Sequence, residues 1–176
     1  MIELLLNQAL TDLVKTAVKD FSLEKSPRKV ETKNDRRPGG LFVDSDPAVE
    51  TETKERAGVT VYDGWLPSKD VSRPSDFPFV TVRPSAGTVE NGCTTVTEEI
   101  VIGTFSRDED GYHDAMNVAQ RIATAISNLK FNVLAGKYEK ADPMSWNMPF
   151  EQEKPFFMVV LTTTWRVYTT QFPFDD

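Results

Sequence analysis

Residues 95–129 decide the fold, and they read TVTEEIVIGTFSRDEDGYHDAMNVAQRIATAISNL. The first part is rich in β-branched and aromatic side chains, which predicts a strand that ends at Phe105. After an acidic loop, apolar residues recur at steps of four, three, four and three, which is one face of an α-helix. These apolar residues are Ala115, Ala119, Ile122, Ile126 and Leu129. The stretch therefore predicts a strand that leads directly into a helix packed on a sheet.

The acidic loop between this strand and helix reads SRDEDG at positions 106–111. Asp110 stands where an N-cap residue of the helix is expected. The DEDG sequence also matches part of a calcium-binding loop, but positions 1 and 12 of that loop would be Ser106 and Asn117. The first carboxylate and the bidentate glutamate are therefore missing. We expect this loop to act by helix capping and charge, with no metal and no other cofactor.

The chain of 176 residues is expected to form a single α+β domain over residues 1–176. Its net charge is −7, and residues 87–114 hold seven acidic residues against one arginine. Such an acidic surface repels DNA phosphates. Cys93 is the only cysteine, so neither an intrachain disulfide nor a cysteine metal cluster is expected. Because charged residues interrupt the first apolar run, no signal peptide and no membrane span are expected, and the product is predicted to be soluble and intracellular.

The N-terminal part of the chain divides into a predicted helix and a predicted insertion. Ile2–Phe21 has the apolar spacing of an amphipathic helix packed on the sheet. Ser22–Gly58 carries eight basic and eight acidic residues with several prolines and glycines, which is typical of an extended loop. Within it, Leu41, Phe42 and Val43 form a short apolar segment that could anchor on a neighbouring subunit.

Four further strands are predicted along the rest of the chain. They span Val59–Trp65, Phe77–Pro84, Phe131–Tyr138 and Phe156–Thr170. A turn region over Ser85–Thr94 and a loop over Asp142–Pro149, which carries Trp146, are expected to separate strands. In the last strand Trp165 belongs to the apolar face and is expected in the core. Short connections favour hairpins, so the expected fold is a mostly antiparallel sheet with helices packed on one face.

Residues that could catalyse a reaction are few. His113 is the only histidine, and no Gly-x-Ser-x-Gly turn is present to expose a nucleophile. Glu98 and Glu99 are adjacent on a strand, so they point to opposite faces and cannot act as one dyad. We therefore expect no enzyme, although a small enzyme with a site made of His113 and carboxylates remains an alternative.

Several short segments occur in an order that identifies a family resemblance. The segments are YDGWLP at 62–67, FPFVTVRP at 77–84, IGTFS at 102–106, DGYHD at 110–114, Trp146 and TTTW at 162–165. Together with the N-terminal helix, this order resembles the tail terminator (tail-completion) proteins of long-tailed bacteriophages with flexible tails. The resemblance implies a small α+β subunit without catalytic residues.

The resemblance also implies partners and a location. Such subunits form a homo-hexameric ring that ends polymerisation of the tail tube protein and joins the tail to the head connector or stopper protein. DNA passes through the lumen without specific binding, and the acidic balance of this chain agrees with that. The protein would belong to the virion neck, after assembly in the host cytoplasm. Another head–tail joining protein of the virion is the alternative.

Residues that could contact a subunit or partner follow from the apolar side chains left over by the predicted core and from the acidic loop. Closed ring symmetry is the usual way to bury such patches. The expected interface residues are Leu41, Phe42, Val43, Arg83, Asp108, Glu109, Asp110, Trp146, Phe172 and Phe174.

Overall fold

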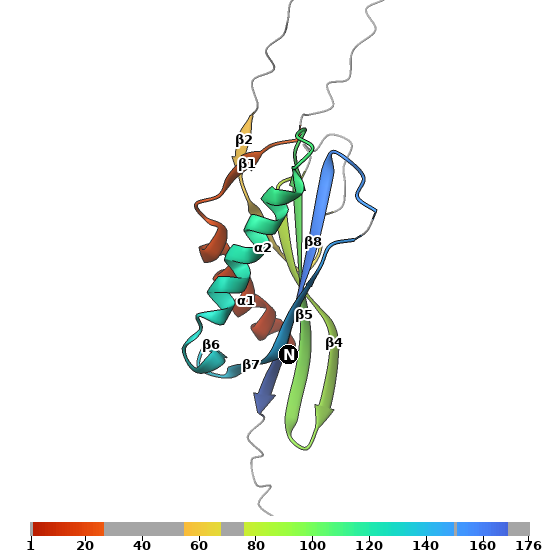
Figure 1. Ribbon diagram of the computed structural model, residues 1–176. Coiled ribbons are helices and arrows are strands. Elements are labelled where there is room, and N and C mark those ends of the chain that lie inside the picture. The colour runs from red at the N-terminus through yellow and green to blue at the C-terminus, as the bar shows by residue number, and fades with distance from the viewer. Residues whose placement is uncertain (1, 27–54, 68–75, 150, 169–176) are drawn as a thin grey trace, which may run out of the picture.

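A computed structural model describes residues 2–26, 55–67, 76–149 and 151–168 (Figure 1). Five of the expected interface residues lie outside the described residues. These are Leu41, Phe42, Val43, Phe172 and Phe174. The structure therefore bears on the other five.

A six-stranded sheet forms the body of the molecule, with strand order β3-β4-β5-β8-β7-β6. Its strands are β3 (Thr60–Asp63), β4 (Phe79–Glu90), β5 (Cys93–Phe105), β6 (Val133–Leu134), β7 (Tyr138–Asn147) and β8 (Phe156–Tyr168). All neighbouring strands are antiparallel except β3 and β4, which run parallel. A separate two-stranded ribbon pairs β1 (Ser22–Glu24) with β2 (Arg56–Gly58). The predicted fold class, a mostly antiparallel sheet with helices on one face, is confirmed.

Two helices cover one face of the sheet, α1 (Ile2–Val18) and α2 (Tyr112–Ser127) (Figure 1). A 3-10 turn, η1 (Lys130–Asn132), follows α2. α1 packs on β3 and β4, and α2 packs on β5 and β8. Neither helix packs extensively on β7. The first residues of β7 are nevertheless buried, as Tyr138 and Lys140 show, whereas Trp146 farther along the strand is exposed.

The core lies between the sheet and the two helices, and the strand periodicity explains its composition. Side chains alternate between the faces of a strand, and every second residue of β8 from Phe157 to Val167 is buried. Trp165 is fully buried among them, as predicted, and its Nε1 donates a hydrogen bond to Thr163 Oγ1 at 2.9 Å. The predicted apolar face of α2 is also confirmed, since Ala115, Ala119, Ile122 and Ile126 are buried.

Two segments predicted to be turn or loop are strands. β4 continues through Pro84 to Glu90, so the expected turn region over Ser85–Thr94 shrinks to Asn91 and Gly92. Pro84 fits because the register shifts between it and Ala86, and because β3 has already ended on that side. The expected loop Asp142–Pro149 is mostly β7, in which the register shift between Ala141 and Ser145 accommodates the proline.

Two predictions for the N-terminal region are also corrected. The ends of the predicted insertion Ser22–Gly58 are not loop, because β1 and β2 pair there. In α1 the apolar residue Leu5, which the predicted apolar stripe includes, is exposed, whereas the polar residues Asn7 and Thr11 are buried. The helix thus places two polar side chains against the sheet.

Candidate interaction surface

Cys93 and His113, which by residue type alone could pair as nucleophile and base, are far apart. Cys93 begins β5 and His113 lies in the first turn of α2, just after the other end of that strand. At 3.3 Å per residue the strand separates them by about 40 Å. The imidazole of His113 instead lies against the ring of Tyr112, with a centroid distance of 4.3 Å. Within the described ranges no group of three or more His, Cys, Asp or Glu residues could hold a metal ion.

The acidic turn before α2 is held by hydrogen bonds that its backbone N–H groups donate, and no side chain caps the helix. The Asp108 N–H donates to Ser106 Oγ at 3.2 Å, and the His113 N–H donates to the Asp110 carbonyl oxygen at 2.9 Å. The N-cap residue is Gly111, and no side-chain cap hydrogen bond is present. The prediction that Asp110 is the N-cap is therefore wrong, because the turn brings Asp110 one residue ahead of the cap position.

This acidic turn is tied to the β1–β2 ribbon. Glu24 of β1 accepts a hydrogen bond from the Arg107 N–H at 3.4 Å, and its carboxylate lies 3.7 Å from Arg107 Nε. Lys25, which follows β1, pairs with Glu55 at 2.9 Å. Since residues 27–54 begin and end at this ribbon, the base of the insertion lies beside the acidic turn.

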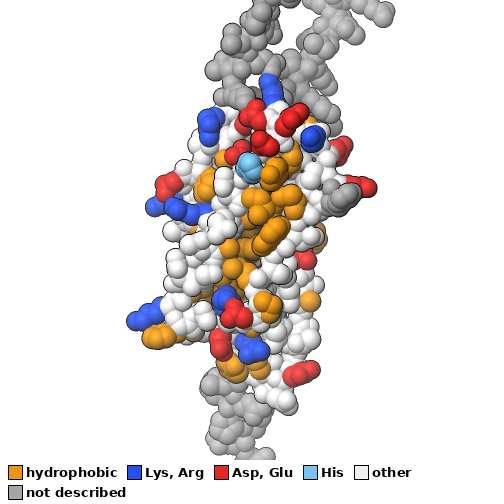
Figure 2. All heavy atoms as spheres, viewed as in Figure 1, with side chains coloured by type: hydrophobic (Ala, Val, Ile, Leu, Met, Phe, Trp, Pro, Cys, Tyr) orange, Lys and Arg blue, Asp and Glu red, His pale blue; other side chains and the backbone are white. Residues whose placement is uncertain are grey.

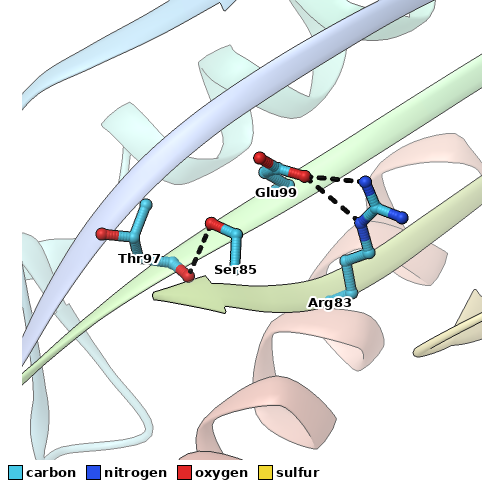
Figure 3. Close-up of polar contacts among 4 residues, drawn as sticks. All are labelled: Arg83, Ser85, Thr97 and Glu99. Atoms are coloured by element: carbon cyan, nitrogen blue, oxygen red, sulfur yellow. Dashed lines mark hydrogen bonds and ion pairs between the residues drawn. The ribbon is translucent and has the colours of Figure 1, made fainter. Parts of the chain in front are cut away.

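Arg83 lies on the sheet face opposite the helices (Figure 3). It forms a cluster there with Glu99 and Trp65. Its Nε and Nη2 donate to Glu99 Oε2 at 3.2 and 2.9 Å. Its guanidinium carbon lies 4.4 Å from the ring centroid of Trp65, whose side chain is 74% exposed. Nearby, Ser85 Oγ donates to the Thr97 carbonyl oxygen at 3.4 Å. An exposed tryptophan and arginine held in place are the side chains most often found at the energetic centre of protein interfaces.

Trp146 lies toward the other end of the sheet, in the second half of β7. Trp146 is paired across the strands with Leu161, whose side chain is buried in the core, so Trp146 lies on the helix-bearing face of the sheet. The side chain of Trp146 is 60% exposed. Met144 and Met148, on either side of it in sequence, pack partly against the core. Figure 2 shows apolar side chains gathered in a stripe down the face that α2 and β8 present to the viewer. A contiguous exposed apolar surface of this kind is typical of a contact site.

The described interface candidates do not form one site. Arg83 belongs to β4, Trp146 to β7 at the far side of β5 and β8, and Asp108, Glu109 and Asp110 to the turn after β5. They lie on three separate parts of the sheet and its connections.

Two residues of interest were missed by the sequence reasoning. Trp65 is exposed beside Arg83, and nothing in its short turn segment predicts that contact. Glu98 is fully buried on the helix-bearing face. A signal for Glu98 was present, since it shares the strand phase of Val96 and Ile100, both of which are apolar and buried.

The chain matches no protein-family model and no curated protein sequence. In the described part of the chain, neither helix has the length and apolar character needed to cross a membrane.

Proposed function

We propose that this chain is a structural subunit of a bacteriophage neck, a tail terminator that forms a homo-hexameric ring on the end of the tail tube. The ring would stop polymerisation of the tail tube protein and would join the tail to the head connector or stopper protein. DNA would pass through its lumen without specific binding. The proposal starts from the family resemblance in the sequence.

The observation that supports the proposal best is that the sheet has two open edges at opposite ends. Among the described residues, β7 from Ser145 to Asn147 pairs only with β8, and β4 beyond Val82 pairs only with β5. An unpaired strand edge is a template for contact with another chain unless it is covered. Two different edges on one subunit suit a head-to-tail contact, and head-to-tail contacts generate rings when the rotation closes.

The charge of the surface supports the same proposal. The exposed turn of Asp108, Glu109 and Asp110 would recur once in every subunit of a ring. A band of negative charge on the lumen would not retain DNA, whereas on a rim it would favour a basic partner surface.

The test is the mass and shape of the purified full chain, alone and with tail tubes. Native mass spectrometry should give a closed species of six copies, or electron microscopy should show a ring at one end of added tubes. A chain that stays monomeric in both settings, or that occurs as one unsymmetric copy on the tube, would exclude the proposal.

Removal of the exposed tryptophan on β7 should weaken the ring. We expect Trp146→Ser to raise the concentration needed for assembly at least about tenfold, because truncation of a central tryptophan in an interface commonly costs about 2 kcal/mol or more. The matched control is Phe131→Ser, since Phe131 is 83% exposed but lies in the turn after α2. Sedimentation velocity over a dilution series measures both variants. Equal losses in the two variants would argue against a contact at β7.

A further inference from the structure

Glu98 is an acidic residue in the middle of the core. It lies on the helix-bearing face of β5, with Pro84 of β4 and Thr163 of β8 as its cross-strand neighbours. Its side chain is fully buried, and within the described part of the chain neither carboxylate oxygen has a hydrogen-bond partner. A buried charge without a partner is costly, so such a group is expected to be neutral.

A second carboxylate lies close to Glu98 and is linked to α1. Asp63, the last residue of β3, accepts a hydrogen bond from Asn7 Nδ2. Burial, with a further contribution from the negative charge of Asp63, raises the pKa of Glu98 to about 8. At neutral pH the Glu98 carboxyl group therefore keeps its proton.

Other charged groups on the neighbouring elements are directed elsewhere. Arg83 of β4 and Glu99 of β5 lie on the opposite face of the sheet and pair with each other. Lys140 of β7 shares the helix-bearing face, but it pairs with Asp142. Of the described groups around Glu98, Asp63 is the one whose charge acts on it appreciably.

The buried side of α1 also carries two polar oxygens without a partner. Asn7 Oδ1 and Thr11 Oγ1, one helical turn apart, are buried and have no hydrogen-bond partner among the described residues. Deprotonation of Glu98 would add a second negative charge near Asp63, and no described residue donates a hydrogen bond to stabilise it.

The sheet is the stronger of the two layers that enclose Glu98. β5 is paired along its whole length with β8 and with β4, so the strands are held by continuous backbone ladders. α1 is attached to the sheet through side chains, chiefly Leu6, Leu10 and Val14. When the buried site becomes unfavourable, α1 is therefore the part that can separate.

We propose that Glu98 is a buried proton-binding site near Asp63, an exposed residue that Asn7 links to α1, and that release of the proton loosens α1. This device belongs to the subunit itself and does not depend on ring formation.

The direction of the pH effect follows from the two states of Glu98. With α1 in place the pKa is about 8, and when α1 separates the exposed carboxyl returns toward its ordinary value of 4.5. Between these values opening releases one proton. The equilibrium constant for opening should rise up to about tenfold per pH unit from pH 5 to 8, and should level off above pH 8.

Hydrogen–deuterium exchange of the full chain between pH 5 and 9 tests this proposal. After correction for intrinsic exchange, the α1 amides should lose protection up to pH 8 in the native protein. Glu98→Gln should remove this pH dependence. Glu99→Gln, a change of the same size at the adjacent position on the other face, should retain it.

A second variant keeps the test decisive if Glu98→Gln does not fold. Asp63→Asn removes the repulsion, so protection of α1 should level off below pH 8. The proposal is wrong if α1 protection in the native protein does not change between pH 5 and 8, or if Glu98→Gln keeps the native response. It is equally wrong if millimolar Ca²⁺ or Mg²⁺ restores protection at pH 8, because the site would then bind a cation.

Discussion

Replacement of Trp165 by alanine is expected to lower the free energy of unfolding by about 3 to 5 kcal/mol. The side chain is fully buried in β8 and faces Val96 of β5 on one side and Lys140 of β7 on the other. Its removal leaves a large cavity and takes the hydrogen-bond donor away from the buried Thr163 hydroxyl. The loss is large beside the 5 to 15 kcal/mol of stability that is typical of a domain.

Urea unfolding of two further variants shows whether burial is the cause. Trp165→Phe keeps most of the volume and loses the N–H donor, so its unfolding midpoint should lie between those of the native protein and Trp165→Ala. Tyr168→Ala removes an aromatic ring from the same strand, but Tyr168 is exposed, so its midpoint should stay close to the native one. If Tyr168→Ala cost as much as Trp165→Ala, burial of Trp165 in the core could not explain the loss.

The sequence predicts the central part of the fold well because periodicity there is governed by burial. In β5 and β8 the buried residues recur at every second position over much of each strand, and in α2 they recur at helical spacing. The pairing register of β5 with β8 keeps the buried residues of both strands on the same face of the sheet. These three elements also make the contacts that hold the sheet and α2 together. In this region the hydrophobic pattern and the tertiary packing agree, so the pattern alone predicts these elements and their buried faces.

The outer strands are harder to predict because their pairing does not depend on local pattern. Pro84 and Pro143 each suggest the end of a strand, yet a register shift lets β4 and β7 continue along strands already fixed in the sheet. In α1, Asn7 and Thr11 are buried although both are polar, which no spacing of apolar residues reveals.

Among the candidate surface residues, too, some features follow from the local sequence and others only from how distant segments pair. Trp146 and the acidic turn, which the sequence predicts as interface residues, are exposed, and their contact with another chain stays a prediction. The stacking of Trp65 on Arg83 joins two segments that come together only through the parallel pairing of β3 with β4. The strand phase separates Glu98 from Glu99 and places it with the apolar residues Val96 and Ile100, but burial of an acidic residue runs against the usual preference of charged side chains for the surface.

The acidic turn gives the second prediction, since Gly111 and not Asp110 decides how α2 begins. A Cβ added at Gly111 would lie 2.5 Å from Ser106 Cβ and 2.6 Å from Phe157 Cε2. Ser106 Cβ is fixed to the backbone of the turn, and Phe157 is buried, so neither can withdraw easily. Overpacking of this kind commonly costs about 1 to 3 kcal/mol.

A competing effect must be weighed at this position. Gly111 has φ −58 and ψ −19, which alanine adopts without strain. Replacement of glycine by alanine at such a position would by itself stabilise by about 0.4 to 1 kcal/mol, through the unfolded chain. Because the contacts are so short, we expect the clash to win and Gly111→Ala to be destabilising by about 1 to 2 kcal/mol.

Asp110→Ala is the matched control at the neighbouring position. Asp110 supplies its carbonyl oxygen to the His113 N–H, which alanine keeps, and it makes no side-chain cap hydrogen bond. What remains is its charge near the helix N-terminus, worth a few tenths of a kcal/mol at an exposed site. Thermal melting of both variants should therefore show a clear loss for Gly111→Ala and a small one for Asp110→Ala. The reverse order would mean that Asp110 caps α2 in solution and that the turn rearranges around it.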